Sequence, residues 1–100
     1  MVSSLTEAML QPESFSLDRA YPNPFNPTTT ISFGLPETIN VILEVYDIKG
    51  RIVSNIIDNI NMDAGYHSAA WNADSHSSGV YFVKLHAGSY VKTQKIMLLK

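Results

Sequence analysis

The chain of 100 residues is long enough for one domain and too short for two separate hydrophobic cores. A hydrophobic fraction of 45% with 16% charged residues excludes a disordered charged tail, and the absence of cysteine excludes disulfides, thiolate metal sites and a cysteine nucleophile. The net charge is −2 with scattered basic residues, so nucleic acid is not an expected partner. The longest apolar runs, residues 80–83 and 96–99, are too short to span a membrane.

The first fourteen residues differ from the rest of the chain. They begin with neither the positively charged region nor the apolar region of a signal peptide. Leu5, Ala8 and Met9 can share one helical turn, which Pro12 ends. We expect residues 1–14 to be a linker or a cloning remnant and residues 15–100 to be the domain.

Apolar and polar residues alternate with a period of two through most of the domain, which predicts short strands. The alternation places one apolar face on each strand, and tight turns at Gly50, Gly65 and Gly88 separate neighbouring strands. We expect six strands, at residues 28–35, 39–47, 51–57, 65–72, 79–85 and 90–99, and a seventh if residues 15–20 also pair. Short strands with tight turns and no helical period predict an all-β sandwich, in hairpin or Greek-key order. The predicted core contains Ile31, Phe33, Leu43, Val45, Trp71, Tyr81, Val83 and Leu85.

Two of the expected strands have less regular patterns. Residues 51–57 place Ile52 and Ile56 on one face and Val53 and Ile57 on the other. In the last strand, Lys92 and Gln94 have the same parity as the apolar residues Ile96 and Leu98. This predicts either a β-bulge or a strand that is buried only near its end.

The histidines and the one triad-like pattern do not form a convincing catalytic or metal site. His67, His76 and His86 fall in different expected elements and lack the short spacing typical of metal ligands. Asp74, His76 and Ser78 alternate within one polar loop, with no turn that would expose a nucleophilic serine. We interpret this segment as a solvated loop and His76 as a loop histidine.

A calcium loop is also not supported. Asn59, Asn61 and Asp63 resemble its opening, but Ala64 stands where the glycine is required and Ala70 where the bidentate glutamate is required. No glycine-rich phosphate loop is present. The sequence therefore predicts no catalytic residue, no bound metal and no cofactor.

The aromatic residues divide by parity into buried and exposed sets. Trp71 has the parity of the apolar faces and is expected in the core, whereas Tyr46 and Phe82 have the opposite parity and are candidates for an exposed patch. A sugar-stacking platform remains an alternative for such a patch.

The segment of residues 21–27, YPNPFNP, is called the proline segment below. Its three prolines fix the backbone φ angle, remove N–H donors and push the preceding residues away from helical conformations. We expect a stiff extended segment whose asparagines bond to local backbone and whose Tyr21 and Phe25 pack onto the sandwich.

Five sequence blocks carry a family resemblance. They are YPNPFNPTTTISFGLPE at 21–37, VxLxVYDxxGRxV at 41–53, AGxHxxxW at 64–71, SSGVYFVKLxAG at 77–88 and KTQKIMLLK at 92–100. In this order they resemble the type A C-terminal sorting domain of type IX secretion cargo, a family found in Bacteroidetes. They resemble less fully the immunoglobulin-like (Ig-like) domain of flagellar hook-capping proteins.

The resemblance implies an Ig-like antiparallel sandwich of about seven strands that carries no active site and acts as an address label. The implied partners are the outer-membrane type IX translocon, a surface sortase and an upstream cargo domain in the same chain. Export would pass through the periplasm and end at the cell surface or outside the cell. The recognition signal is expected to spread over the folded surface, at Pro22, Asn23, Pro24, Gly50, Gly79, Tyr81, Gly88, Lys92, Lys95 and Lys100.

Within that signal, we expect the last strand to matter most. A final strand lies at or near a sheet edge and offers unpaired backbone groups to a partner, while Lys92 and Lys95 discourage aggregation at that edge. The alternatives are an uncleaved structural or adhesive Ig-like accessory domain of an extracellular enzyme and a carbohydrate-binding module.

Overall fold

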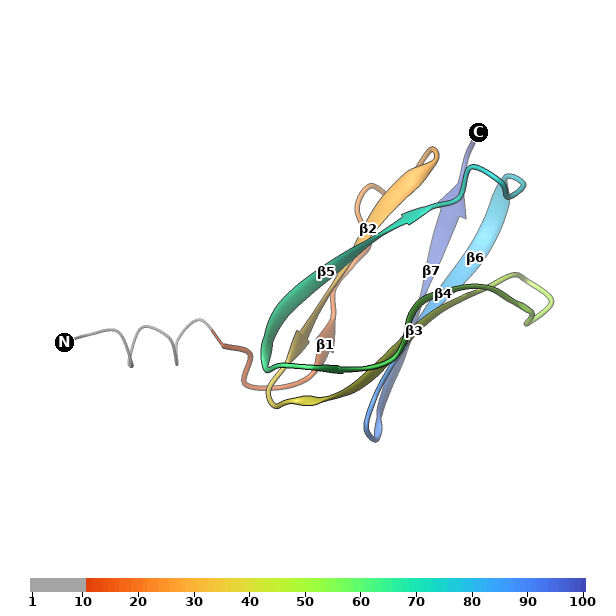
Figure 1. Ribbon diagram of the computed structural model, residues 1–100. Helices are drawn as coiled ribbons and strands as arrows, with labels where there is room; N and C mark the ends of the chain where they lie inside the picture. The colour runs from red at the N-terminus through yellow and green to blue at the C-terminus, as the bar shows by residue number, and fades with distance from the viewer. Residues whose placement is uncertain (1–10) are drawn as a thin grey trace.

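The computed structural model describes residues 11–100, and its regular secondary structure is entirely β (Figure 1). Residues 16–17 do pair, so the sandwich has seven strands and the predicted all-β fold is confirmed. Residues 1–10 of the expected linker, including the three residues that can share a helical turn, lie outside the described residues. The strands are β1 (Ser16–Leu17), β2 (Thr28–Leu35), β3 (Ile39–Tyr46), β4 (Ile52–Met62), β5 (Gly65–Asn72), β6 (Gly79–Ala87) and β7 (Tyr90–Leu98).

The strands form two antiparallel sheets that face each other (Figure 1). One sheet has the order β1-β2-β5 and the other the order β4-β3-β6-β7. The chain crosses between the sheets after β2, β4 and β5, which gives the strand order that the sequence left open and is consistent with an Ig-like sandwich. Within the described residues, no helix is long and apolar enough to cross a membrane.

The core lies between the sheets and consists of the alternating apolar faces. All eight residues predicted for it are buried in one cluster, and Trp71 is only 4% exposed. The cluster also contains residues outside the predicted set, among them Phe25 from the proline segment and Ile96 and Leu98 from β7. Burial of these apolar surfaces is the main source of the free energy that holds the two sheets together.

Strand β4 departs from the simple alternation predicted for residues 51–57. Its pairing with β3 shifts register three times, so that Ile57 lies opposite Leu43 and Ser54 lies opposite Val45. Ile57 is buried, whereas Ile52 lies opposite Tyr46 and is exposed. Each bulge places an extra residue on β4, so the alternation of faces does not continue regularly along this strand. The prediction that Ile52 and Ile56 share one face and Val53 and Ile57 the other is therefore wrong.

Strand β7 resolves the second irregular pattern. Its pairing with β6 is unbroken from Tyr90 to Leu98, so no bulge is present along this pair. Ile96 and Leu98 are buried, and Lys92 is exposed. The strand is thus buried only near its end, as one of the two predicted alternatives stated.

We predict that Trp71→Ala lowers the free energy of unfolding by about 3–5 kcal/mol, the usual range for removing a buried large aromatic side chain. The indole packs against Phe25, His76 and Tyr81, so its removal leaves a cavity among three rings. Urea unfolding measures the change. Tyr66→Ala, on the same strand but 65% exposed, is the control and should stay within about 0.5 kcal/mol of wild type. Equal effects of the two variants would contradict the assignment of Trp71 to the core.

Candidate functional site

The outer edge of β7 is the candidate site, because β7 is the last strand in its sheet and only one of its sides pairs with β6. Backbone groups of successive residues in a strand point to alternate sides. The bonds observed on the outer side involve Lys95, Met97 and Leu99, so the odd-numbered residues of β7 point outward. The predicted edge position of the last strand is confirmed.

The proline segment covers the C-terminal half of this edge. The Phe25 N–H donates to the Met97 carbonyl at 2.9 Å, and the Leu99 N–H donates to the Phe25 carbonyl at 3.0 Å. These two bonds form a short parallel bridge between the segment and β7. The expectation that the last strand offers unpaired backbone groups therefore does not hold for the C-terminal half of its edge.

Asn23 extends the covered region by one more pair of bonds. Its side-chain Oδ1 accepts from the Met97 N–H at 3.0 Å, and its Nδ2 donates to the Lys95 carbonyl at 3.2 Å. A carboxamide has the donor and acceptor of a peptide group, so Asn23 pairs with β7 as a neighbouring strand would. The expectation that this asparagine bonds to local backbone is wrong, since its partners lie 72 and 74 residues away in the sequence.

The proline segment is anchored through one of its two aromatic residues. Phe25 is buried against Trp71, with ring centroids 5.8 Å apart, as expected. Tyr21 is 80% exposed, so its predicted packing onto the sandwich is wrong. Tyr21 instead pairs through its backbone with Thr30, and the Thr29 hydroxyl donates to the Pro22 carbonyl at 2.7 Å. These bonds tie the segment to β2 while Pro22 and Pro24 remain at the surface.

The N-terminal half of the β7 edge, residues 91–95, is called the open half below. The N–H and C=O groups of Val91 and Thr93 and the N–H of Lys95 point outward and make no hydrogen bond with any of residues 11–100. Gln94, on the other parity, accepts from the Ala20 N–H at 2.8 Å and donates to the Asp18 carbonyl. Gln94 thus bonds to the chain beside β1, a role that the sequence analysis missed.

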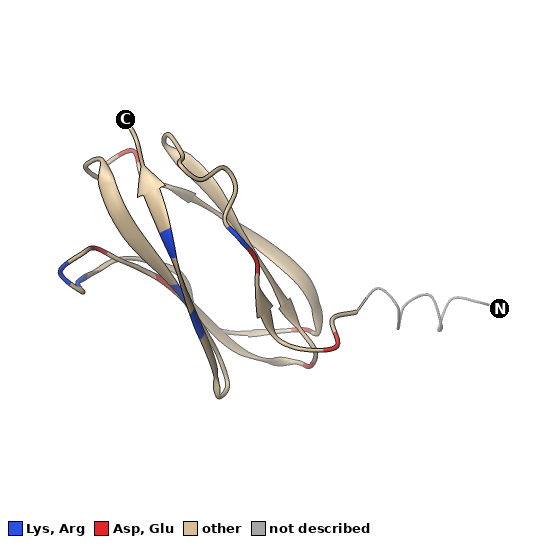
Figure 2. Ribbon diagram, turned by 180° about the vertical axis from the view of Figure 1, so that it is seen from behind, with Lys and Arg blue, Asp and Glu red and all other residues tan. Residues whose placement is uncertain are grey.

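Positive charge accumulates near the open half although the whole chain has a net charge of −2. Lysines of β6 and β7 lie on neighbouring positions, with Lys84 opposite Thr93 and Lys95 opposite Phe82. Figure 2 shows the basic positions gathering on these two strands. None of these lysines (Lys84, Lys92 and Lys95) forms an ion pair with a described residue.

Lys100 and Tyr81 hold the loop that connects β5 to β6. The Lys100 Nζ donates to the carbonyls of Asp74 and His76, and its backbone N–H donates to the Ser78 hydroxyl at 2.9 Å. The Tyr81 hydroxyl donates to the carbonyl of residue 77 at 2.6 Å, while its ring is buried in the core. Lys100 and Tyr81, both predicted to belong to the recognition signal, therefore form hydrogen bonds with the β5–β6 loop of the same domain.

The loop histidine is more enclosed than the interpretation of a solvated loop implied. The His76 ring lies 5.5 Å from the Trp71 ring and 6.1 Å from the Tyr81 ring, because buried Ala73 draws the loop inward. No hydrogen bond in the described structure joins this ring to Asp74 or Ser78. Among residues 11–100, no group of three or more His, Asp or Glu residues is arranged to hold a metal ion.

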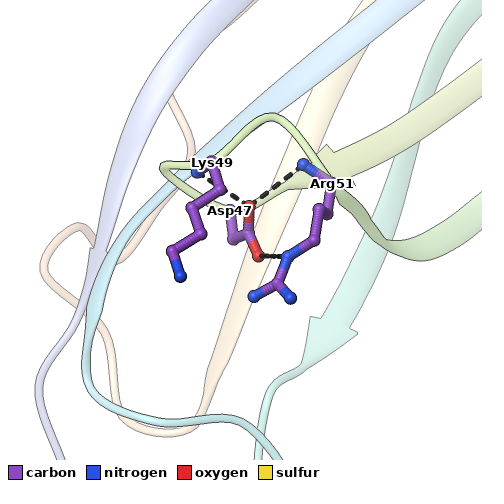
Figure 3. Close-up of polar contacts among 3 residues, drawn as sticks. All are labelled: Asp47, Lys49 and Arg51. Atoms are coloured by element: carbon purple, nitrogen blue, oxygen red, sulfur yellow. Dashed lines mark hydrogen bonds and ion pairs between the residues drawn. The ribbon is translucent and has the colours of Figure 1, made fainter.

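The β3–β4 turn is the second ordered surface feature. Asp47 accepts hydrogen bonds from the backbone N–H groups of Lys49 at 2.9 Å and Arg51 at 3.0 Å, and from the Arg51 Nε at 2.8 Å (Figure 3). The bond from the Arg51 N–H is the main cause that lowers the pKa of Asp47 below its usual value. Gly50 completes the turn with a φ of 81°, which confirms its predicted position.

Two shallow hollows flank this turn. One, of about 330 Å³, is lined by Tyr46 and Phe82, together with Lys84 and Thr93 and part of the turn. The other, of about 250 Å³, lies between the turn and the start of β6 at Gly79. Tyr46 and Phe82 are half-buried on the outer face of the sheet, in keeping with their parity. Gly88, the remaining glycine of the predicted signal, lies in the β6–β7 turn.

The comparisons with known proteins point to one family. The model of the secretion system C-terminal sorting domain matches residues 19–99. The match contains the proline segment and the strands from β2 to β7, and so it includes both partners of the β7 edge. The search of curated proteins found no match.

We predict that Asn23→Ala destabilises the domain by about 1–3 kcal/mol, because two hydrogen bonds to β7 are lost and each contributes about 0.5–1.5 kcal/mol. Urea unfolding measures the loss, and amide exchange should report faster exchange at Met97. Asn26→Ala is the matched control, since the Asn26 side chain makes no hydrogen bond within the described residues. If both variants unfold at the same urea concentration, Asn23 does not fasten the edge.

We predict that the contribution of Asp47 to stability depends on pH. Its pKa is lower in the folded than in the unfolded chain, so the contribution is complete above the ordinary value of about 3.9 and is lost as the pH falls through the folded value. The difference in melting temperature between wild type and Asp47→Asn should therefore shrink between about pH 6 and about pH 2. Asp58→Asn removes the same charge at an exposed site on β4 and serves as the control. A difference that stays constant with pH would contradict the role of the carboxylate.

Proposed function

The chain belongs to the family of type IX secretion C-terminal sorting domains, and from that premise we propose that residues 15–100 form an address label for a cargo in the same protein. Family membership establishes a sorting role in export and an interaction with the type IX machinery. The proposal adds that the outer-membrane translocon reads the folded domain in the periplasm. It further adds that a surface sortase then attaches the cargo to the cell surface, and that the domain itself catalyses no reaction.

The observation that carries the proposal is the organisation of the β7 edge. A sorting label needs a surface feature that another protein can read in the folded state. Half of this edge is closed by Asn23 and Phe25, and the other half presents backbone groups that bond to none of the described residues, beside exposed Lys92 and Lys95. Exposed edge backbone of this kind is a common recognition element, to which flanking side chains add specificity.

The non-catalytic part of the proposal is supported by the surroundings of the triad-like residues. The His76 ring packs with Trp71 and Tyr81, so it is placed to support the loop and not to accept a proton from Ser78. In our interpretation the loop is a structural element of the sandwich end.

We further propose two roles within the predicted recognition residues. Residues exposed at or beside the β7 edge contact the machinery directly, and these are Pro22, Pro24, Lys92 and Lys95. The others position the edge or its loops, and these are Asn23, Gly50, Gly79, Tyr81, Gly88 and Lys100. Substitutions in the second group should alter sorting together with folding stability.

The test is a fusion of a reporter enzyme to the N-terminus of the full chain, preceded by a Sec signal peptide. We predict that the reporter leaves the cell, or reaches its surface, in a host with a type IX translocon and remains in the periplasm of the isogenic host without one. Deleting the sortase gene should release the reporter into the medium with this domain still attached. An equal distribution of the reporter in hosts with and without the translocon would rule out the sorting function, and cell-surface attachment that survives sortase deletion would favour an uncleaved accessory domain.

A further inference from the structure

The open half of the β7 edge differs from the covered half because its outward backbone groups make no hydrogen bond with residues 11–100, although the Gln94 side chain bonds to Ala20 and Asp18. Val91 is 49% exposed and Thr93 is also exposed, so the outward N–H and C=O groups between them face solvent. A backbone donor or acceptor is a strong hydrogen-bonding group, and an edge with several of them in line is a template for an added strand. The site is short because Asn23 occupies the edge from the Lys95 carbonyl onward.

The covered half indicates that this edge accepts a strand. Phe25 already pairs with it in parallel, and Asn23 continues the pairing with its side chain. An additional segment at residues 91–95 would lie in line with the proline segment, as a continuation of the same outermost strand. The sheet would then be extended along most of β7 without any change in the bonds between β6 and β7.

The surrounding charges indicate the chemistry of the added segment. Lys95 projects on the outer face of the sheet and Lys92 has the opposite parity, so positive charge flanks the open half on both faces. Neither lysine is neutralised by an ion pair within the described residues, whereas Lys84, one strand further in, has its ammonium 5.8 Å from the centre of the Tyr46 ring on β3. A segment with acidic side chains on both faces would pair with Lys92 and Lys95, since opposite charges on adjacent strands stabilise a sheet.

A second copy of this chain is a poorer occupant. If two open halves paired in antiparallel fashion about Thr93, Lys92 of each copy would lie opposite Gln94 of the other, which makes the two Lys92 side chains diagonal neighbours on the same face. Like charges on adjacent strands are destabilising, and lysines at an edge are a common device against self-association. The charges therefore favour an acidic partner over a homodimer.

We propose that residues 91–95 of β7 are a strand-addition site for an extended acidic segment of a protein of the sorting machinery. The proposal rests on the proposed function and specifies how the label is read. Recognition then depends on backbone hydrogen bonds at Val91, Thr93 and Lys95 and on the charges of the flanking lysines. Sequence discrimination comes from the charges, while the backbone bonds supply sequence-independent affinity.

The sharpest test is Thr93→Pro. The Thr93 N–H points away from β6, so proline removes an outward donor and blocks strand addition without breaking a bond of the β6–β7 ladder. The full chain is fused to the secreted reporter in the host with the translocon, and the melting temperature of the same variant is measured. We expect secretion to fall at least about tenfold, which corresponds to about 1.4 kcal/mol of binding, with a melting temperature within about 5 °C of wild type. Thr93→Val keeps the N–H and the side-chain shape and should be secreted as wild type.

Two charge-reversal variants test the contribution of the flanking lysines, and this test does not depend on how well β7 tolerates proline. Lys95→Glu reverses a charge at the open half, and Lys49→Glu makes the same change at the exposed β3–β4 turn. We expect Lys95→Glu to reduce secretion at an unchanged melting temperature and Lys49→Glu to have no effect. If the melting temperature of Thr93→Pro falls by more than about 5 °C, the comparison of Lys95→Glu with Lys49→Glu decides whether the open half is recognised.

Each outcome has a defined meaning. If the wild-type fusion is secreted only with the translocon and both Thr93→Pro and Lys95→Glu are secreted normally, strand addition at this site is wrong and the sorting function stands. If Lys49→Glu is as harmful as Lys95→Glu, overall charge and not the open half is recognised, which also overturns the site. If sedimentation shows a wild-type dimer that Thr93→Pro dissociates, the occupant is a second copy and the acidic partner is wrong. Failure of the wild-type fusion to require the translocon would instead contradict the proposed function.

Discussion

The contact between the proline segment and β7 is the interaction on which the rest of this structure depends. It joins residues 23–25 to the last strand. Asn23 donates to the Lys95 carbonyl and accepts from the Met97 N–H, while Phe25 donates to the Met97 carbonyl and accepts from the Leu99 N–H. The same segment inserts the Phe25 ring into the core beside Trp71. One short stretch of chain therefore closes half of an exposed edge and seals one end of the sandwich.

Within the described chain, only the C-terminal half of the β7 edge is covered. An unpaired edge promotes aggregation, but it also offers backbone groups to a binding partner. Proteins limit aggregation by covering the edge or by placing charges along it. Here both devices occur on one strand, with the proline segment over the C-terminal half and Lys92 and Lys95 along the rest. The division leaves a defined stretch of backbone that is flanked by charge and that hydrogen-bonds to no covering segment among residues 11–100.

The end of the sandwich near Lys100 is organised around aromatic rings. Phe25, His76 and Tyr81 surround Trp71, and they come from three segments that are distant in the sequence. The Lys100 ammonium and the Tyr81 hydroxyl bind carbonyls of the loop that carries His76. Lys100 and Tyr81, which the sequence analysis assigned to the recognition signal, thus fix the position of this loop against the core.

The sequence by itself determined the elements whose pattern is local. Alternation in residues 28–35 and 79–85 was enough to place Phe33, Tyr81 and Val83 in the core, because a pleated strand directs alternate side chains to opposite faces whatever its neighbours are. Gly50 likewise marked a turn through its own backbone freedom. The Asp47 hydrogen bonds in that turn are also local in sequence, because their donors lie two and four residues further along the chain.

Only the tertiary structure decided the features that depend on a partner strand. The faces of Ile52 and Ile57 follow from bulges, and a bulge is defined by two residues opposing one on β3, which no pattern within β4 reveals. The bonds of Asn23 to β7 span 72 and 74 residues of sequence, and a single carboxamide leaves no periodic signal of such a distant partner. The division of the β7 edge into a covered and an open half was therefore invisible in the sequence, because it arises only when the first and last segments of the domain are brought side by side.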